Sequence, residues 1–372
     1  MPKIAVDAMG GDRAPAVVIE GALLARQELG VDIVLVGPPE IIGAELAKHP
    51  SAPAIAIVPA SQVVPMHESP SLALRRKNSS MKVAFDMMRG GDADAVVSAG
   101  NSGAMMALGM FVMGKLSHVM RPAILVVVPS TSKGTVIVDA GANVDCKPRH
   151  LLQFGLMGSI YAESVLGMAK PRVGVLSNGE ESTKGTELTR AASALLGATT
   201  INYIGYVEGR DIFNGKVDVI VCDGFTGNVA LKTMEGVASF AGEVLKSAFE
   251  KNVASMVGYL MSRNSLKSAY RKLDYAEYGG APLVGLDGVA IVAHGGSSAL
   301  AIKSAIRLAR DAVDHEINRR IVTALNNTET GEDIKKEGLP HKIWSRLKAK
   351  IDSVGDKPET EDSEDERSRR GE

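Results

Sequence analysis

Short runs rich in valine and isoleucine, separated by stretches with helical periodicity, are the feature that most limits how this chain can fold. Nine such runs follow one another: IAVDA, DIVLVG, AIAIVPA, DAVVSAG, AILVVVP, GTVIVDAG, RVGVLSNG, INYIGYV and VDVIVCDG. Helical stretches such as APAVVIEGALLARQELG and SSMKVAFDMMRGGDA lie between many of them. Strands that alternate with helices predict a largely parallel sheet covered on both faces, which is a three-layer α/β/α fold.

Composition excludes several classes of protein. The net charge of −1 provides no overall basic field for nucleic acid. The two cysteines, Cys146 and Cys222, do not make a disulfide framework and are interpreted as reduced thiols of a cytosolic protein. The N-terminus reads as a strand rather than a signal peptide, and no apolar run approaches the ~20 residues that span a bilayer. We therefore expect a soluble or peripheral protein.

Two segments depart from the strand and helix alternation. Residues 228–275 read as a long helical region, interpreted as a helical arm or a second subdomain of an α/β/α domain at 1–334. The C-terminal extension at 335–372 lacks apolar residues near its end, and we expect disorder from about residue 350.

Small polar loops follow several strands and open helices. Asn101, Ser102 and Gly103 follow DAVVSAG, the segment FTGN follows VDVIVCDG, and Ser297 follows AIVAHGG. Helix N-termini attract anions, and the carboxyl ends of strands are where open α/β folds bind ligands. A packing turn explains any one of these loops, so it is their number that predicts a shared anion site.

The loop at 177–185 carries the most chemically versatile set of side chains. Lys184 is a candidate to neutralise a phosphate or a developing oxyanion, and the alternative is an exposed lysine on a helix's first turn. Glu180 and Glu181 are site residues or caps of that helix. His294 is an acid/base group or a structural histidine, and Cys222 is a nucleophile or, more simply, a buried small hydrophobe.

Several chemistries lack their sequence signatures. There is no G-x-x-x-x-G-K-[ST] loop, no G-x-S-x-G elbow and no H-E-x-x-H. The histidines and cysteines form no zinc-type cluster, so we predict neither a metal nor a cofactor. The first loop, DAMGGD, does not match the dinucleotide fingerprint G-x-G-x-x-G.

Eight ordered motifs resemble one family closely: DAMGGD at 7–12, ALRRKNSSM at 73–81, SAGNSGA at 98–104, VDAGAN at 138–143, GEESTKG at 179–185, CDGFTGN at 222–228, YGGAPLVG at 278–285 and AHGGSS at 293–298. They are similar to the motifs of the bacterial acyl carrier protein:phosphate acyltransferase of phospholipid synthesis. The resemblance covers roughly residues 1–330 and departs at Ser102, where threonine is more usual.

The resemblance implies a reaction and a fold. A long-chain acyl group passes from the thioester of acyl carrier protein to inorganic phosphate, which gives an acyl phosphate. The implied fold is similar to phosphate acetyltransferase and isocitrate dehydrogenase-like folds. Also implied are a homodimer, a cytoplasmic location at the inner face of the membrane, and work beside the glycerol 3-phosphate acyltransferase that consumes acyl phosphate.

The resemblance also assigns site residues. Lys184 and Asn228 are the expected catalytic residues, for phosphate and for the tetrahedral oxyanion. The expected substrate-binding residues are Asp7, Gly10, Gly11, Asp12, Arg75, Arg76, Lys77, Asn101, Ser102, Gly103, Asp139, Asn143, Asn178, Glu180, Glu181, Asp223, Gly224, Thr226, Gly227, His294, Gly295 and Ser297. Asp139 and Asn143 are equally interpreted as residues that hold loops.

Two surfaces are candidates for partners. Acyl carrier proteins are acidic, and a matching basic patch is expected either at 75–77 or at Arg263, Lys267, Arg271 and Lys272. The apolar VASMVGYLM at 253–261, followed by that basic segment, suits a membrane surface or a dimer contact equally well. The arm at about 253–272 is therefore expected to contact the membrane, the carrier protein or the second subunit.

Three other functions compete with this interpretation. A phosphate acetyltransferase-like enzyme would use a short acyl-CoA and the same phosphate nucleophile. A scaffold without catalytic activity would recruit lipid-synthesis proteins, but it has little need for so many polar loops. A dehydrogenase is the weakest alternative, because no dinucleotide fingerprint is visible.

Overall fold

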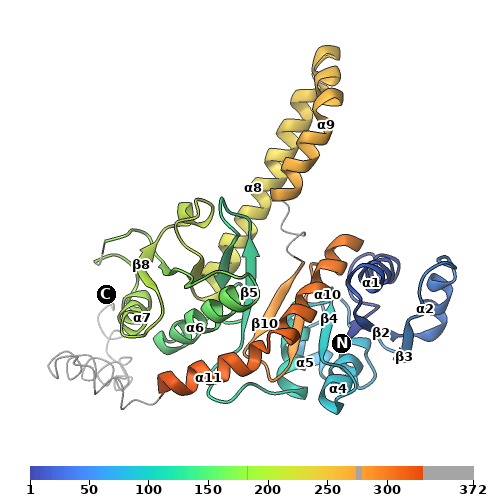
Figure 1. The fold of residues 1–372 in the computed structure, drawn as a ribbon, viewed down its shortest axis with the longest axis horizontal. Coiled ribbons are helices and arrows are strands. Elements are labelled where there is room, and N and C mark those ends of the chain that lie inside the picture. The colour runs from blue at the N-terminus through green and yellow to red at the C-terminus, as the bar shows by residue number, and fades with distance from the viewer. Residues whose placement is uncertain (182, 274–278, 330–372) are drawn as a thin grey trace, which may run out of the picture. The chain divides into compact units, whose positions relative to one another are not determined.

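The computed structural model describes residues 1–181, 183–273 and 279–329, and these form an 11-stranded sheet in the order β3-β2-β1-β4-β11-β10-β5-β6-β9-β7-β8 (Figure 1). The strands are β1 (Lys3–Asp7), β2 (Asp32–Gly37), β3 (Ala56–Pro59), β4 (Ala95–Ser98), β5 (Ala123–Val128), β6 (Thr135–Val138), β7 (Val173–Leu176), β8 (Tyr203–Val207), β9 (Val219–Val221), β10 (Ala281–Val284) and β11 (Val289–Val292). Seven of the ten strand pairings are parallel, so the largely parallel α/β sheet is confirmed.

The direction of the strands reverses across the middle of the sheet. Strand β11 pairs antiparallel with β10, β10 with β5, and β5 with β6. Three reversals in succession leave β6, β9, β7 and β8 running opposite to β1, β2, β3, β4 and β11. The sequence did not predict this reversal, nor β10 itself, whose four residues include Pro282.

Helices cover both faces of each half of the sheet. They are α1 (Ala16–Leu29), α2 (Pro39–Leu46), α3 (Pro70–Ala73), α4 (Ser80–Gly90), α5 (Ser102–Val112), α6 (Pro148–Ser164), α7 (Glu187–Gly197), η1 (Gly209–Ile212), α8 (Gly224–Glu250), α9 (Val253–Leu273), α10 (Ala299–Asp314) and α11 (Ile317–Glu329). On the first half, α1 and α10 pack on one face, while α4 and α5 pack on the other. On the second half, α6 and α7 oppose η1 and the start of α8.

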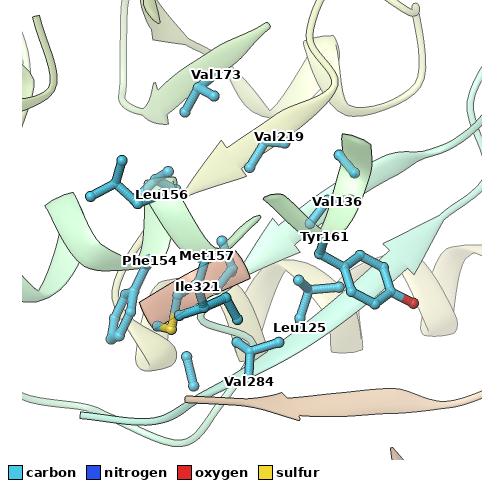
Figure 2. Packing of buried hydrophobic residues seen from close by; sticks show 14 of the residues in the cluster. Leu125, Val136, Phe154, Leu156, Met157, Tyr161, Val173, Val219, Val284 and Ile321 are labelled. Atoms are coloured by element: carbon cyan, nitrogen blue, oxygen red, sulfur yellow. The ribbon is translucent and has the colours of Figure 1, made fainter. Parts of the chain in front are cut away.

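The core of the second half follows from the alternation of side chains along its strands. Val136 and Val219 point to the face covered by α6, where they belong to the same buried cluster as Phe154 and Met157 (Figure 2). The intervening Ile137 points to the other face, together with residues of η1 and β9. A strand with apolar residues on both faces is buried on both sides, as the continuous valine and isoleucine runs indicate.

The helical region expected at 228–275 consists of α8 and α9, which lie side by side and leave the sheet together (Figure 1). Only the first turn of α8 is buried. Beyond it, α8 and α9 expose many large apolar side chains: Val237, Phe240, Val244, Leu245, Val253, Met256, Val257, Tyr259, Leu260 and Met261. Within the described residues, no helix is both long and apolar enough to cross a membrane.

The boundary of the main domain at 334 and the disorder expected from about residue 350 lie outside the described residues. The main body of contacts covers residues 1–327, and α11 is the last described element.

Gly21 allows α1 to lie directly on α10. A Cβ atom added to Gly21 would lie 2.5 Å from Ile302 Cβ and 2.7 Å from the carbonyl oxygen of Ala299. Real Cβ atoms do not approach backbone so closely, and a backbone atom cannot swing away. By contrast, Gly43 on α2 has open space around its Cβ position.

We predict opposite effects of the same substitution at these two helical glycines. Gly21→Ala lowers the free energy of unfolding by about 1–3 kcal/mol, because the two helices must separate. Gly43→Ala raises it by about 0.5–1 kcal/mol, because alanine restricts the unfolded chain. Urea denaturation of both variants measures this, and a neutral Gly21→Ala contradicts the packing argument.

Candidate active site

The reversal of strand direction divides the polar loops into two groups. The first loop group follows β1, β4 and β11 and comprises residues 7–13, 98–103 and 293–298. The second loop group follows β6, β7 and β9 and comprises residues 139–143, 177–185 and 222–228. Because the two sets of strands run in opposite directions, the groups lie at opposite edges of the sheet. The sequence predicted one shared site, but a single chain does not gather all the predicted site residues in one place.

Asp7 ties together the turns of the first loop group. Its carboxylate accepts a hydrogen bond from Ser98 Oγ at 2.7 Å and from the backbone N–H of Met9 at 3.1 Å. Ser98 Oγ in turn accepts from the Gly100 N–H at 3.0 Å. Burial raises the pKa of Asp7 above its ordinary value. A Cβ added to Gly10 would lie 2.7 Å from the Gly100 nitrogen, so glycine is required at this turn.

The loop after β11 packs on the loop after β1. The Asp12 N–H donates to the Gly295 carbonyl at 2.9 Å. The Arg13 guanidinium donates to the carbonyl oxygens of Gly296 and Ser297 at 2.8 and 2.7 Å. Ser297 is buried. The structure thus brings Asp7, Gly10, Gly11, Asp12, Gly295 and Ser297 together.

His294 is exposed and begins this loop. Its Nδ1 accepts from the Gly296 N–H at 3.1 Å. This bond fixes the ring against the loop and suits the structural interpretation of the histidine.

Asn101 joins the first loop group to a neighbouring segment, residues 61–80. Its Oδ1 caps α5 by accepting from the Ala104 N–H at 3.0 Å. Its Nδ2 donates to the carbonyl oxygens of Met66 and Glu68 at 2.9 and 2.7 Å. Ser102 and Gly103 form the first turn of α5 and are exposed.

The basic residues at 75–77 lie on that neighbouring segment and differ in their surroundings. The Arg76 guanidinium holds both carboxylate oxygens of Glu68, at 2.7 and 2.8 Å. Arg75 and Lys77 are exposed. Arg76 is therefore paired with Glu68 in this structure, and its role in binding substrate stays a prediction. Of the other basic set, Arg263 is exposed, and the side chains of Lys267, Arg271 and Lys272 lie outside the described residues.

Asp139 is the centre of the second loop group. Its buried carboxylate accepts from the N–H groups of Ile124, Gly141, Ala142 and Asn143 at 2.6–3.2 Å, and from Asn143 Nδ2 at 2.9 Å. Both carboxylate oxygens are thus satisfied within the protein. This arrangement matches the interpretation of Asp139 and Asn143 as residues that hold loops.

The loop after β9 packs closely on Asp139 and opens α8. Asp223 caps this helix by accepting from the Thr226 N–H at 2.9 Å and from the Thr226 hydroxyl at 2.7 Å. A Cβ added to Gly227 would lie 2.0 Å from the Asp139 carbonyl oxygen, and one added to Gly224 would also clash there. Both glycines are therefore required for the close approach of the two loops.

Asn228 is the fifth residue of α8, one turn after its start, with its side chain exposed beside Gly141. An ideal Cβ on Gly141 would lie 3.6 Å from the Asn228 side chain. The amide is therefore close to the loop held by Asp139 and accessible from outside.

The loop after β7 completes the second loop group. Asn178 Oδ1 accepts from the Gly185 N–H at 2.9 Å, which closes the loop. Lys184 is exposed and makes no ion pair with other described residues. It does not lie on a helix's first turn, because α7 begins at Glu187 after the cap Thr186.

The two glutamates of this loop do not cap α7 either. Glu180 pairs with Lys216 at 2.7 Å and lies 3.7 Å from Arg210, and Glu181 is exposed. Since β7 and β9 are adjacent and parallel, the loop with Lys184 lies next to the one with Asn228.

Neither cysteine is activated as a nucleophile. Cys222 is buried, with its Sγ 3.6 Å from the Asp139 carbonyl oxygen, and burial raises its pKa well above the ordinary value. Burial, with the nearby charge of Asp139, raises the pKa of Cys146 to about 11. Both thiols are therefore protonated at neutral pH, and only the thiolate is a good nucleophile.

Metal ligands do not gather in the described part of the chain, where no group of three or more histidine, cysteine, aspartate or glutamate side chains could hold an ion. Three residues that organise the loops escaped the sequence analysis: Arg13, Glu68 and Ser98. Ser98 and Arg13 sit inside or beside quoted motifs, but their partners lie 91 and more than 280 residues away. Only the fold reveals such pairs.

Known proteins have sequences similar to this chain over the segments that form both loop groups. A sequence model described as "Fatty acid synthesis protein" matches residues 2–320, which include both loop groups. The protein named "Phosphate acyltransferase" of Citrifermentans bemidjiense is 52% identical over 91% of this chain and 97% of its own length. The one of Geobacter sulfurreducens is 52% identical over 88% of this chain and 95% of its own length.

Solved structures show the same fold at low sequence identity. A phosphotransacetylase from Streptococcus pyogenes aligns with a TM-score of 0.58 and 14% identity over 84% of this chain and 94% of its own. A 4-hydroxythreonine-4-phosphate dehydrogenase from Klebsiella pneumoniae aligns with a TM-score of 0.52 and 15% identity over 84% and 100%. The expected similarity to the phosphate acetyltransferase fold is confirmed, and at such identity the likeness concerns the fold alone.

We predict that Asp139 is essential for stability. Asp139→Ala leaves the two buried donors of Asn143 and three part-buried N–H donors without an acceptor, so the free energy of unfolding falls by roughly 3 kcal/mol or more. The exposed Asp145 in the same loop region is the matched control, and Asp145→Ala changes stability by less than about 0.5 kcal/mol. Urea denaturation compares the two, and equal effects contradict the role given to Asp139.

Proposed function

Because the chain belongs to the fatty acid synthesis protein family and is an acyltransferase, we propose that it moves a long-chain acyl group from acyl carrier protein to inorganic phosphate. The observation that carries the proposal is the match to relatives named phosphate acyltransferase, at 52% identity over 91% of the chain. The product is an acyl phosphate for phospholipid synthesis.

The reaction needs no nucleophile from the protein. An oxygen of hydrogen phosphate attacks the thioester carbonyl carbon and forms the new C–O bond. The tetrahedral intermediate then collapses, the C–S bond breaks, and the proton of hydrogen phosphate ends on the departing thiol. The protonated state of Cys146 and Cys222 supports this direct attack over an acyl-cysteine intermediate.

We assign the binding of phosphate and of the thioester carbonyl to the second loop group. Lys184 is exposed on the loop after β7, the strand that pairs with β9, so its charge is available to a phosphate dianion. The Asn228 amide, one turn into α8, is suited to donate to the oxyanion of the intermediate. Holding phosphate against the thioester replaces a bimolecular encounter by fixed geometry.

The first loop group lies at the other edge of the sheet, and its part in substrate binding stays a prediction. Its helix starts at α5 and α10 favour negatively charged ligands in general. In one chain they are not close to the carbonyl that the second loop group would hold.

The exposed apolar side chains of α8 and α9 support further parts of the proposal. Surfaces of this kind occur at subunit contacts and at membranes. We propose a cytoplasmic homodimer whose arm rests peripherally on the inner face of the membrane. There the product would reach the acyltransferase that transfers it to glycerol 3-phosphate.

The first experiment measures acyl phosphate formation by the purified protein from phosphate and palmitoyl-acyl carrier protein, with acetyl-CoA in parallel. We expect product from the carrier-protein thioester alone. Turnover of acetyl-CoA alone would instead support a phosphate acetyltransferase-like enzyme. Failure with both donors would leave a scaffold as the better interpretation.

We predict that Lys184→Ala lowers kcat/KM for phosphate about a hundredfold, because a charge that stabilises the dianion is lost. Lys216→Ala is the matched control. Lys216 lies close by but is already paired with Glu180, so kcat/KM changes less than about twofold. Steady-state kinetics at varied phosphate concentration decide the matter, and an unaltered Lys184→Ala enzyme removes Lys184 from the site.

We predict that Met256→Glu combined with Leu260→Glu abolishes binding to phosphatidylglycerol vesicles while the dimer persists, because charged side chains do not enter the apolar layer. Met256→Leu with Leu260→Met preserves the apolar surface and retains binding. Vesicle flotation and analytical ultracentrifugation are the measurements. Loss of the dimer in the glutamate variant would assign this surface to the subunit contact instead.

A further inference from the structure

Residues 61–80 form a compact strap whose two ends meet. The Gln62 N–H donates to the Asn78 carbonyl at 3.0 Å, and the Asn78 N–H donates to Gln62 Oε1 at 3.2 Å. The Ser80 N–H also donates to the Gln62 carbonyl at 3.0 Å. Compact surface loops with closed ends frequently serve a function, because their shape is fixed by their own contacts.

The middle of the strap is closed by one ion pair. Arg76 Nε donates to Glu68 Oε2 at 2.7 Å and Arg76 Nη2 to Glu68 Oε1 at 2.8 Å. Such a two-bond pair is stronger and more directional than a single contact. The Glu68 side chain is only 11% exposed, and the neighbouring guanidinium lowers its pKa, so it stays ionised at neutral pH.

The strap is fastened over the first loop group at three points. Asn101 Nδ2 holds the carbonyl oxygens of Met66 and Glu68 while the same side chain caps α5. Pro70 lies against Gly103, where an added Cβ would be 3.3 Å from Pro70 Cγ. The Met66 methyl lies against Gly295, 2.7 Å from an added Cβ. The strap therefore bridges the loops that follow β4 and β11.

The pairing of Arg76 decides which charges the strap presents. Glu68 neutralises Arg76, while Arg75 and Lys77 on either side of it are exposed to solvent. Two exposed cations on a shaped loop favour an acidic partner, and the proposed acyl donor is an acidic protein.

We propose that Glu68 is a positioning residue: its ion pair with Arg76 holds the strap in the shape that presents Arg75 and Lys77 to acyl carrier protein. The inference rests on the proposed function for the identity of the donor. It differs from the expectation that all three basic residues bind substrate, because Arg76 here pairs with Glu68 and holds the strap, while Arg75 and Lys77 face the carrier.

A charge effect and a positioning effect predict opposite results for Glu68→Ala. Removing Glu68 makes the strap more positive, so a surface that worked by charge alone would bind the acidic carrier more tightly. If Glu68 positions the strap, binding weakens despite the added positive charge. The pair exchange Glu68→Arg with Arg76→Glu keeps the net charge and rebuilds the ion pair with reversed polarity.

The experiment measures the Kd for holo-acyl carrier protein by calorimetry, and KM for palmitoyl-acyl carrier protein, KM for phosphate and kcat by steady-state kinetics. We expect Glu68→Ala to raise Kd and KM for the carrier about fivefold, with kcat and KM for phosphate unchanged. The pair exchange restores both carrier constants to within about twofold of the original. Glu45→Ala, which breaks the ion pair with Lys48 at the end of α2, alters none of them.

Unchanged or tighter carrier binding by Glu68→Ala would overturn the proposal. So would a pair exchange that folds but fails to restore binding, since Arg76 would then itself contact the carrier. If Glu68→Ala does not fold, the pair exchange alone decides. Failure of the proposed function is separate: the unaltered protein would then form no acyl phosphate from the carrier-protein thioester.

Discussion

The reversal of strand direction across β10 and β5 is the constraint on which the rest of this structure depends. Backbone pairing fixes the direction of every strand, and the direction of a strand decides at which edge its following loop emerges. Three antiparallel pairings in succession therefore send the polar loops of the two halves to opposite edges. Lys184 and Asn228 share one edge, while Asp7, Asn101 and His294 share the other.

The two halves of the sheet hold their polar loops in similar ways. In each, an aspartate at the end of a strand is buried and gathers the donors of neighbouring loops. Asp7 engages Ser98 and the turn at Gly10, whereas Asp139 engages N–H groups of its own loop and of β5. Polar groups held in this way stabilise the loops rather than react, which leaves chemistry to the exposed side chains around them.

Sequence patterns predicted most of the scaffold. Valine and isoleucine runs marked the strands of both halves, and the absence of a strand pattern marked α8 and α9 correctly. Strand β10 was not predicted, because Pro282 and the two glycines before the strand are not typical of a strand and its apolar run is short. Pairing direction, like the contact between Asp7 and Ser98, joins distant residues and leaves no local trace. The family resemblance is confirmed by the comparisons, while the roles of individual site residues stay predictions.

The first half of the sheet is assembled from both ends of the chain. Strand β4 pairs with β11, and α1 packs on α10, so residues before 100 meet residues after 288. Strands β5 to β9, by contrast, come from the continuous stretch between residues 123 and 221. During synthesis the second half can complete its own pairings on the ribosome while β1 to β4 still wait for their last neighbour. Joining the two halves therefore waits for β10 and β11, which are synthesised after the strands of both halves.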